Sequence, residues 1–123
     1  MQTYRDLIVW QKAVELAVEV YKLTSKFPEE ERYGLVSQMQ RSTVSISSNI
    51  AEGKLRGSSA EWKRFLRIAF GSGGELETQI EIAKRLPQTK DLDYRKIVVL
   101  LDEVMRMLNV ILSKHQAELA PNA

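Results

Sequence analysis

Basic residues in the middle of the sequence could bind phosphate groups. Between Tyr33 and Gly71 the only acidic residues are Glu52 and Glu61, whereas the rest of the chain is slightly acidic. Lysine and arginine neutralise backbone phosphates, which is the sequence-independent part of nucleic-acid binding. We therefore predict a nucleic-acid-binding site at five cations: Lys54, Arg56, Lys63, Arg64 and Arg67. The net charge of the chain is only +2, so ordinary surface charge is the alternative interpretation.

Residues that could carry catalysis are scarce. His115 is the only histidine and the chain has no cysteine, so the serines lack a nearby base to activate them. A di-metal site in a helical bundle uses a Glu-x-x-His pair on each of two helices, and the sequence contains no such pair. The glycines between Gly71 and Gly74 are not followed by the Gly-Lys-Ser/Thr of a phosphate loop. We expect no enzymatic activity, no metal and no cofactor.

Four polar residues would form a layer inside the molecule if the second and third predicted helices pair antiparallel about a turn near residue 56. They are Arg41, Asn49, Glu52 and Glu75. Arg41 and Glu75 would form an ion pair between the helices, and Asn49 and Glu52 would approach Trp10 and the cations of the third helix. Such a layer can fix the register of packed helices, as a buried polar residue does in a coiled coil. A ligand site is the alternative.

Apolar residues recur at helical spacing through most of the sequence. The pattern predicts helices over about residues 5–25, 29–53, 58–86 and 92–117. Gly53 stands where a C-cap glycine belongs, and Ser58 with Glu61 has the spacing of a capping box. The serine-rich run over residues 42–48 has poor helix propensity, so a strand there is the alternative.

Four helices with short connections favour an all-α protein, an antiparallel up-down-up-down four-helix bundle with a single domain over residues 1–123. The first and fourth helices are apolar over more than one face, so we expect this pair to bury a face against another subunit. The small residues from Gly71 to Gly74 would be tolerated where another helix comes very close. No apolar run is long enough to span a membrane and no signal peptide is evident, which indicates a cytoplasmic protein.

Several motifs along the chain resemble those of the 23S rRNA-intervening-sequence proteins, also known as S23 proteins. The run Asn49-Ile50-Ala51-Glu52-Gly53 and the later run with Gly71-Ser72 and Glu75-Leu76-Glu77 are the most specific. Further matching segments are Asp6-Leu7, Val9-Trp10, Phe27-Pro28, Tyr33-Gly34-Leu35, Gln40-Arg41, Ser45-Ile46, Phe65-Leu66 and Ile68-Ala69. The match covers nearly the whole chain, although the fourth helix matches in pattern alone.

The resemblance implies a four-helix bundle that assembles as a ring-like homopentamer, and no enzymatic activity is established for the family. It also extends to the accessory variability proteins of diversity-generating retroelements, which associate with a reverse transcriptase and with nucleic acid. Five copies would turn the modest basic cluster into a ring of positive charge, so we predict an oligomeric protein that binds RNA or DNA. The alternative is a protein-interaction scaffold or an accessory subunit of a nucleic-acid-processing enzyme such as a reverse transcriptase. We expect no membrane partner.

Overall fold

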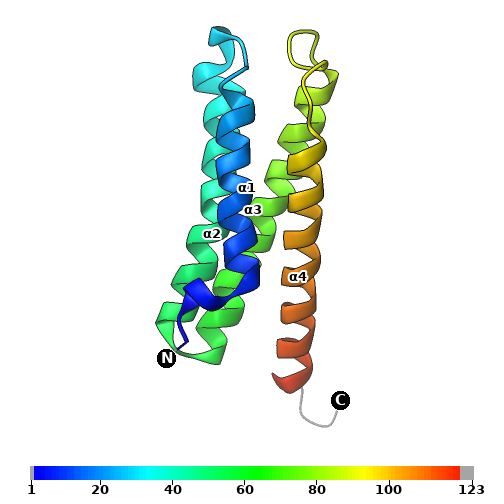
Figure 1. Ribbon diagram of the computed structural model, residues 1–123. Coiled ribbons are helices and arrows are strands. Elements are labelled where there is room, and N and C mark those ends of the chain that lie inside the picture. Colours follow the sequence, from blue (N-terminus) through cyan, green and yellow to red (C-terminus); the bar gives the residue numbers. More distant parts are fainter. Residues whose placement is uncertain (1, 120–123) are drawn as a thin grey trace.

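The protein is a bundle of long helices. The computed structural model describes residues 2–119, and side chains as far as residue 114. This part of the chain forms four α-helices and no strand: α1 (Ile8–Thr24), α2 (Ser37–Arg56), α3 (Ser59–Arg85) and α4 (Arg95–Leu119). Successive helices run antiparallel and pack against each other, and α4 returns to pack against α1 (Figure 1). The all-helical prediction is confirmed, whereas residues 120–123 of the predicted domain lie outside the described part.

The serine-rich run over residues 42–48 is helical, so the strand alternative is wrong. Ser42, Thr43 and Ile46 are all buried, at the spacing that places them on one face of α2. Packing of this face against the neighbouring helices outweighs the poor intrinsic helix propensity of serine and threonine.

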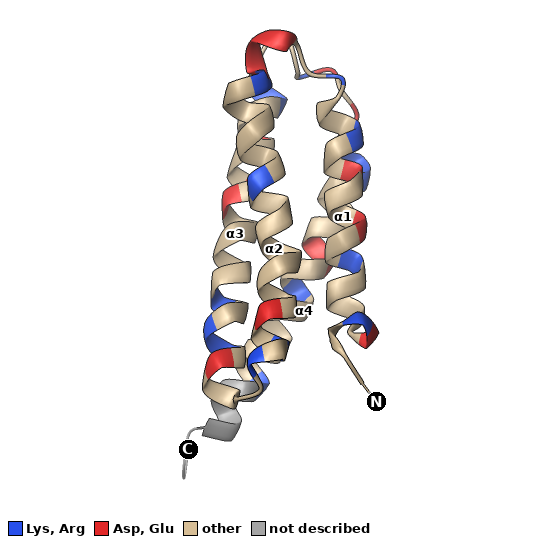
Figure 2. Cartoon of the chain, turned by 90° about the vertical axis from the view of Figure 1, so that its left-hand side faces the viewer, with Lys and Arg blue, Asp and Glu red and all other residues tan. Residues whose placement is uncertain are grey.

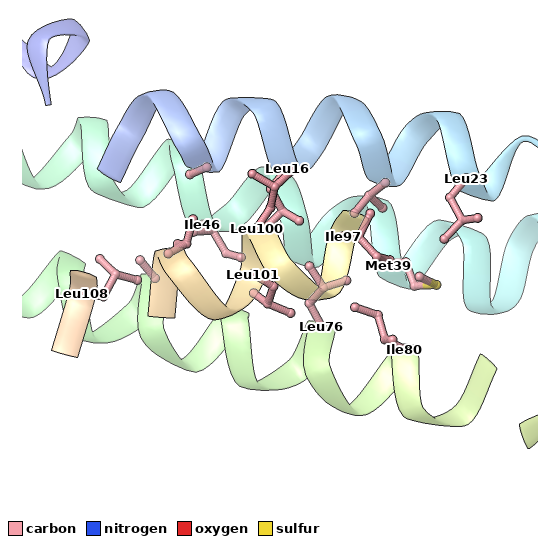
Figure 3. Packing of buried hydrophobic residues seen from close by; sticks show 14 of the residues in the cluster. Leu16, Leu23, Met39, Ile46, Leu76, Ile80, Ile97, Leu100, Leu101 and Leu108 are labelled. Atoms are coloured by element: carbon pink, nitrogen blue, oxygen red, sulfur yellow. The ribbon is translucent and has the colours of Figure 1, made fainter. Parts of the chain in front are cut away.

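The hydrophobic core runs along the whole bundle and takes residues from every helix. Leu16 of α1, Ile46 of α2, Leu76 of α3 and Leu108 of α4 are fully buried and meet between the helices (Figure 3). Burying a side chain of this size stabilises the fold by about 1.5 to 3 kcal/mol. The core therefore fixes the relative positions of the helix ends.

Gly73 is the glycine of the cluster against which a side chain of α4 packs. A Cβ atom built at Gly73 would collide with the Met105 side chain of α4, whereas Gly71 and Gly74 have open space beside them. The close contact is therefore made by one glycine of the cluster and not by the others.

The predicted C-cap at Gly53 is wrong, because α2 continues for one more turn to Arg56. Gly57 ends the helix instead, with a φ of 81° in the left-handed region that favours glycine. Gly53 serves packing: a Cβ atom there would lie 2.9 Å from the Phe65 Cβ atom of α3. Ser58 caps α3, since its hydroxyl accepts a hydrogen bond of 3.1 Å from the Glu61 amide. This is one half of the predicted capping box, because the Glu61 carboxylate accepts a hydrogen bond from Arg64 instead.

The connection between α1 and α2 takes up residues that the sequence pattern assigned to the second helix. A 3₁₀ turn, η2 (Glu29–Glu31), is followed by a π turn, η3 (Arg32–Val36). Gly34, inside η3, has non-helical backbone angles, φ −107° and ψ −108°, which interrupt the helical path that starts at Glu29. For this reason α2 begins at Ser37 and not at residue 29.

The first and fourth helices also start later than predicted, at Ile8 and Arg95. Before α1 the chain forms a separate 3₁₀ turn, η1 (Tyr4–Asp6), which has a capping box between Thr3 and Asp6. Before α4 a connection over residues 86–94 is held by the buried Tyr94, whose hydroxyl donates to the Thr89 carbonyl at 2.8 Å. Burial raises the pKa of the Tyr94 hydroxyl.

Among residues 2–119, none of the helices is long and apolar enough to cross a membrane.

Candidate nucleic-acid interface

The predicted cations all lie at the end of the bundle where α2 turns into α3, which we call the basic end. Lys54 and Arg56 belong to the last turn of α2, and Lys63, Arg64 and Arg67 to the first turns of α3. Only Gly57 and Ser58 connect the two helices, so their charged residues remain close together at the lower end of the hairpin (Figure 2). The structure therefore brings the five predicted residues to one end.

Two of the cations are held against an aromatic ring. Arg56 forms an ion pair of 2.9 Å with Glu52, and Arg64 forms one of 2.9 Å with Glu61. The two guanidinium groups also lie 5.2 Å and 4.5 Å from the centre of the Phe65 ring. These contacts orient both arginines, and the two carboxylates neutralise part of their charge.

The other three cations have no carboxylate partner among the described side chains. Within residues 2–114, no carboxylate lies within 4.0 Å of Lys54, Lys63 or Arg67. Lys63 and Arg67 are one helical turn apart on α3. Lys54 lies elsewhere on the same end, with its ammonium 6.0 Å from the centre of the Trp62 ring. The five residues therefore surround the basic end and do not form a single compact patch.

Arg5 is a cation at this end that the sequence pattern missed. The antiparallel arrangement places the start of α1 beside the end of α2, and η1 contacts α2 directly. The Arg5 guanidinium lies 5.4 Å from the centre of the Tyr4 ring and 5.7 Å from that of Trp10. The signal for it was the predicted topology, because an up-down-up-down bundle brings the start of the first helix to the turn between the second and third.

The predicted polar layer of Arg41, Asn49, Glu52 and Glu75 is not formed as a unit. Arg41 and Glu75 are exposed, and the ion pairs of the described side chains include none between them. Glu52 pairs with Arg56 on the surface of its own helix. Long charged side chains at the rim of a helix pair remain solvated, because bringing them inside would cost their hydration.

Asn49 instead belongs to a smaller polar contact between α2 and α3. Its side-chain amide donates to the Ser45 carbonyl at 2.7 Å and to the Ser45 hydroxyl at 3.0 Å. The Ser45 hydroxyl also lies 2.8 Å from the Ser72 hydroxyl of α3. Ser45 and Ser72 were missed because small polar residues carry no spacing signal of their own.

The structure thus defines a class of protein, an antiparallel four-helix bundle with one basic end. Comparison with known families is more specific: the family model for the 23S rRNA-intervening sequence protein matches residues 5–110, and the chain belongs to this family. A search of curated proteins finds no match. Among solved structures, the chain is similar to a protein of unknown function from the S23 ribosomal protein family of Bacteroides thetaiotaomicron VPI-5482. The sequence identity is 27%, the TM-score is 0.71, and the match covers 85% of this chain and 98% of that chain.

Proposed function

We propose that this protein is a non-enzymatic, oligomeric protein that binds the phosphates of RNA or DNA through its basic end. The observation that carries the proposal is the set of cations without a carboxylate partner among the described residues, namely Lys54, Lys63 and Arg67. They stand on helices, so the backbone that carries them is already ordered before a phosphate backbone approaches. The family name, which refers to ribosomal RNA, favours the same function.

A single copy offers few phosphate contacts, so the proposal includes self-association. We infer a homopentamer, which the resemblance to S23 proteins implies. Repeating the basic end around a ring multiplies the number of simultaneous contacts, which raises avidity without any new type of contact. It also makes binding depend steeply on salt, because each neutralised phosphate releases counterions.

The face that supports self-association is formed by α1 and α2. The expected face, between α1 and α4, is instead crossed by ion pairs, Lys12 with Glu103 at 2.6 Å and Glu19 with Lys96 at 3.1 Å. By the 100° step of a helix, the side of α1 that faces α2 carries no charged residue, and neither does the adjoining side of α2. The residues on these two sides are Trp10, Val14, Ala17, Val18 and Tyr21 of α1 and Gln40, Val44, Ser47 and Ala51 of α2.

This uncharged face is partly open to solvent. Val18 is 49% exposed, Tyr21 46% and Val44 41%. In Figure 2, which looks onto α1 and α2, most charged residues of α1 lie along the edge away from α2. A long uncharged face with exposed apolar residues is typical of a protein–protein interface, so we propose that it contacts the next copy in the ring.

The test of the function is a fluorescence-anisotropy titration of the purified oligomer with labelled RNA and duplex DNA, between about 50 and 200 mM salt. We expect micromolar or tighter affinity that falls steeply as salt rises. The variant with Arg56, Lys63 and Arg67 changed to Glu should lose affinity by on the order of 100-fold while keeping the oligomer intact by light scattering. Undiminished binding by this variant, or no binding by the natural sequence at low salt, would show the proposal to be wrong.

A second candidate function, a scaffold or accessory subunit for a nucleic-acid-processing enzyme such as a reverse transcriptase, is favoured by a groove at the opposite end. This groove, of about 560 Å³, is lined by residues that include Tyr21, Phe27, Tyr33 and Val36. Tyr33 is 86% exposed, with the Arg32 guanidinium 5.3 Å from the centre of its ring. If the titration shows no nucleic-acid binding, this groove is the surface on which to look for a protein partner.

A further inference from the structure

A small cavity opens at the basic end beside the indole of Trp62. Its volume is about 190 Å³. The residues that line it are Gly53, Lys54, Gly57, Ser58, Ser59 and Trp62. No carboxylate is among these lining residues, and one of the five predicted cations, Lys54, is among them. The cavity is therefore part of the same end of the bundle, with an aromatic wall that phosphate binding does not require.

Packing holds the indole of Trp62 in place. A Cβ atom at Gly53 would lie 3.0 Å from the Trp62 Cε3 atom, so the absence of a side chain there lets the ring lie directly against α2. The Lys54 ammonium lies 6.0 Å from the ring centre. A ring that is already fixed loses little entropy when a second flat ring stacks on it.

The polar groups of the cavity suit a flat ligand that carries a phosphate. The Ser58 hydroxyl accepts the hydrogen bond from the Glu61 amide that caps α3, and its O–H can still donate. The exposed Ser59 hydroxyl can donate to or accept from the edge of a base. Lys54 supplies a positive charge at the rim, where the phosphate next to a bound base would lie.

We propose that this cavity binds an unpaired nucleobase, stacked on Trp62, with the adjoining phosphate on Lys54. The inference rests on the proposed function and makes it more specific, because the bases of a duplex are paired and stacked on each other and cannot enter. The protein then binds single strands in preference to duplexes. Stacking on an aromatic side chain tolerates any base, so little sequence preference accompanies it.

Tryptophan fluorescence tests the proposal directly. Trp10 and Trp62 are the only tryptophans, so in the full chain with Trp10→Phe the emission comes from Trp62 alone. Titration with a single-stranded oligouridine should quench this emission, whereas a blunt-ended RNA duplex, compared at equal occupancy by anisotropy, should quench it much less. Equal quenching by the two probes would overturn the proposal.

A second variant keeps Trp62 in place and fills the cavity. Ser59→Leu puts a bulky side chain without an aromatic ring at an exposed position of the lining. We expect its affinity for the oligouridine to fall about 10-fold and its affinity for the blunt-ended RNA duplex to change less than about 2-fold. As a matched control, Ser48→Leu, at an exposed position of α2 outside the cavity lining, should change neither affinity.

The two proposals fail in different ways. If both probes bind, and charge reversal abolishes binding but Ser59→Leu leaves oligouridine affinity unchanged, the phosphate interface stands and the base site is wrong. If neither probe binds the natural sequence at low salt, both proposals are wrong.

Discussion

The two ends of the bundle are closed by different means. At the basic end Gly57 and Ser58 alone join α2 to α3, and the five predicted cations there are carried by the helices themselves. At the opposite end the connections cover residues 25–36 and 86–94 and contain their own turns and hydrogen bonds. Three consecutive glutamates, Glu29–Glu31, form a 3₁₀ turn there.

This difference shows where charge is positioned most firmly. Side chains on the first or last turn of a long helix are held in place because that helix packs into the core. Side chains on a connection depend on local contacts that can rearrange. A surface that must present cations at fixed spacing is better built at the basic end. Four predictions test this contrast, beginning with the one of largest expected effect.

Charge reversal at the opposite end should leave nucleic-acid binding nearly unchanged. Lys26, Arg32 and Lys90 are exposed cations of that end, and changing all three to Glu alters the net charge as much as the reversal at Arg56, Lys63 and Arg67 does. The affinities of the two variants, measured by anisotropy at the same salt, should differ by on the order of 100-fold. Equal losses would mean that binding follows net charge alone and that neither end is a site.

Gly53→Ala should weaken the packing at the basic end. The added methyl group would lie 2.9 Å from the Phe65 Cβ atom, which cannot move without the helix backbone. We expect the free energy of unfolding, from urea titration, to fall by about 1 to 3 kcal/mol. The control is Gly74→Ala, where no atom lies within 4 Å and alanine should stabilise the helix by about 0.5 to 1 kcal/mol. Effects of the same sign at both positions would contradict the close packing of α2 and α3.

Tyr94→Phe should weaken the opposite end by a smaller amount. The variant loses the hydrogen bond from the buried hydroxyl to the Thr89 carbonyl, which should lower the free energy of unfolding by about 0.5 to 1.5 kcal/mol. Tyr33→Phe is the matched control, because that side chain is 86% exposed and should tolerate the change within about 0.5 kcal/mol. Similar losses at the two tyrosines would show that Tyr94 does not anchor the connection.

Asp93→Asn should have the smallest effect, and that effect should depend on pH. Hydrogen bonds from Arg95 hold the pKa of the Asp93 carboxyl well below its usual value of 3.8. A lowered pKa in the folded state means that the charged carboxylate stabilises the fold above about pH 4 and that this contribution is lost as the pH falls. We expect the variant to lower Tm by about 1 to 2 °C at neutral pH, since the pair is exposed.

Thermal melts monitored by circular dichroism at neutral pH and at about pH 2 would check this prediction, because the difference between the two proteins should shrink as the carboxyl becomes protonated. Asp91→Asn, which removes an exposed carboxylate from the same connection without touching the Asp93–Arg95 pair, is the control for the change in charge. A difference that grows on acidification would have the wrong sign for a lowered pKa.

The helices could be predicted from the sequence because apolar spacing reports directly which face is buried. Their boundaries could not, since Gly53 and Gly57 are both suitable C-caps. The contact of Gly53 with Phe65 and Trp62 decides between them, and it depends on how two helices pack. The predicted start of the second helix at residue 29 was also wrong, because the non-helical backbone of Gly34 interrupts the helix before Ser37.

The candidate site shows the same limit. Sequence spacing brings Lys54, Arg56, Lys63, Arg64 and Arg67 to one end as soon as a hairpin is assumed, but it does not show that Glu52 and Glu61 neutralise two of them. Arg41 and Glu75 are level with each other along the hairpin, yet side-chain direction keeps both in solvent. Arg5 and the cavity beside Trp62 depend on tertiary contacts, and local sequence carries no signal for them.

The short connection at Gly57 and Ser58 also has a consequence for the order in which the chain folds. Contacts between α2 and α3, such as Ser45 with Ser72, close a short loop, whereas the Lys12 to Glu103 contact between α1 and α4 closes most of the chain. Because loop-closure entropy rises with length, the central hairpin should form before the outer helices dock. Gly53→Ala should then slow refolding, while Lys12→Gln should mainly accelerate unfolding. The basic end would therefore form early, because α2 and α3, which carry it, are joined by the shortest connection between helices.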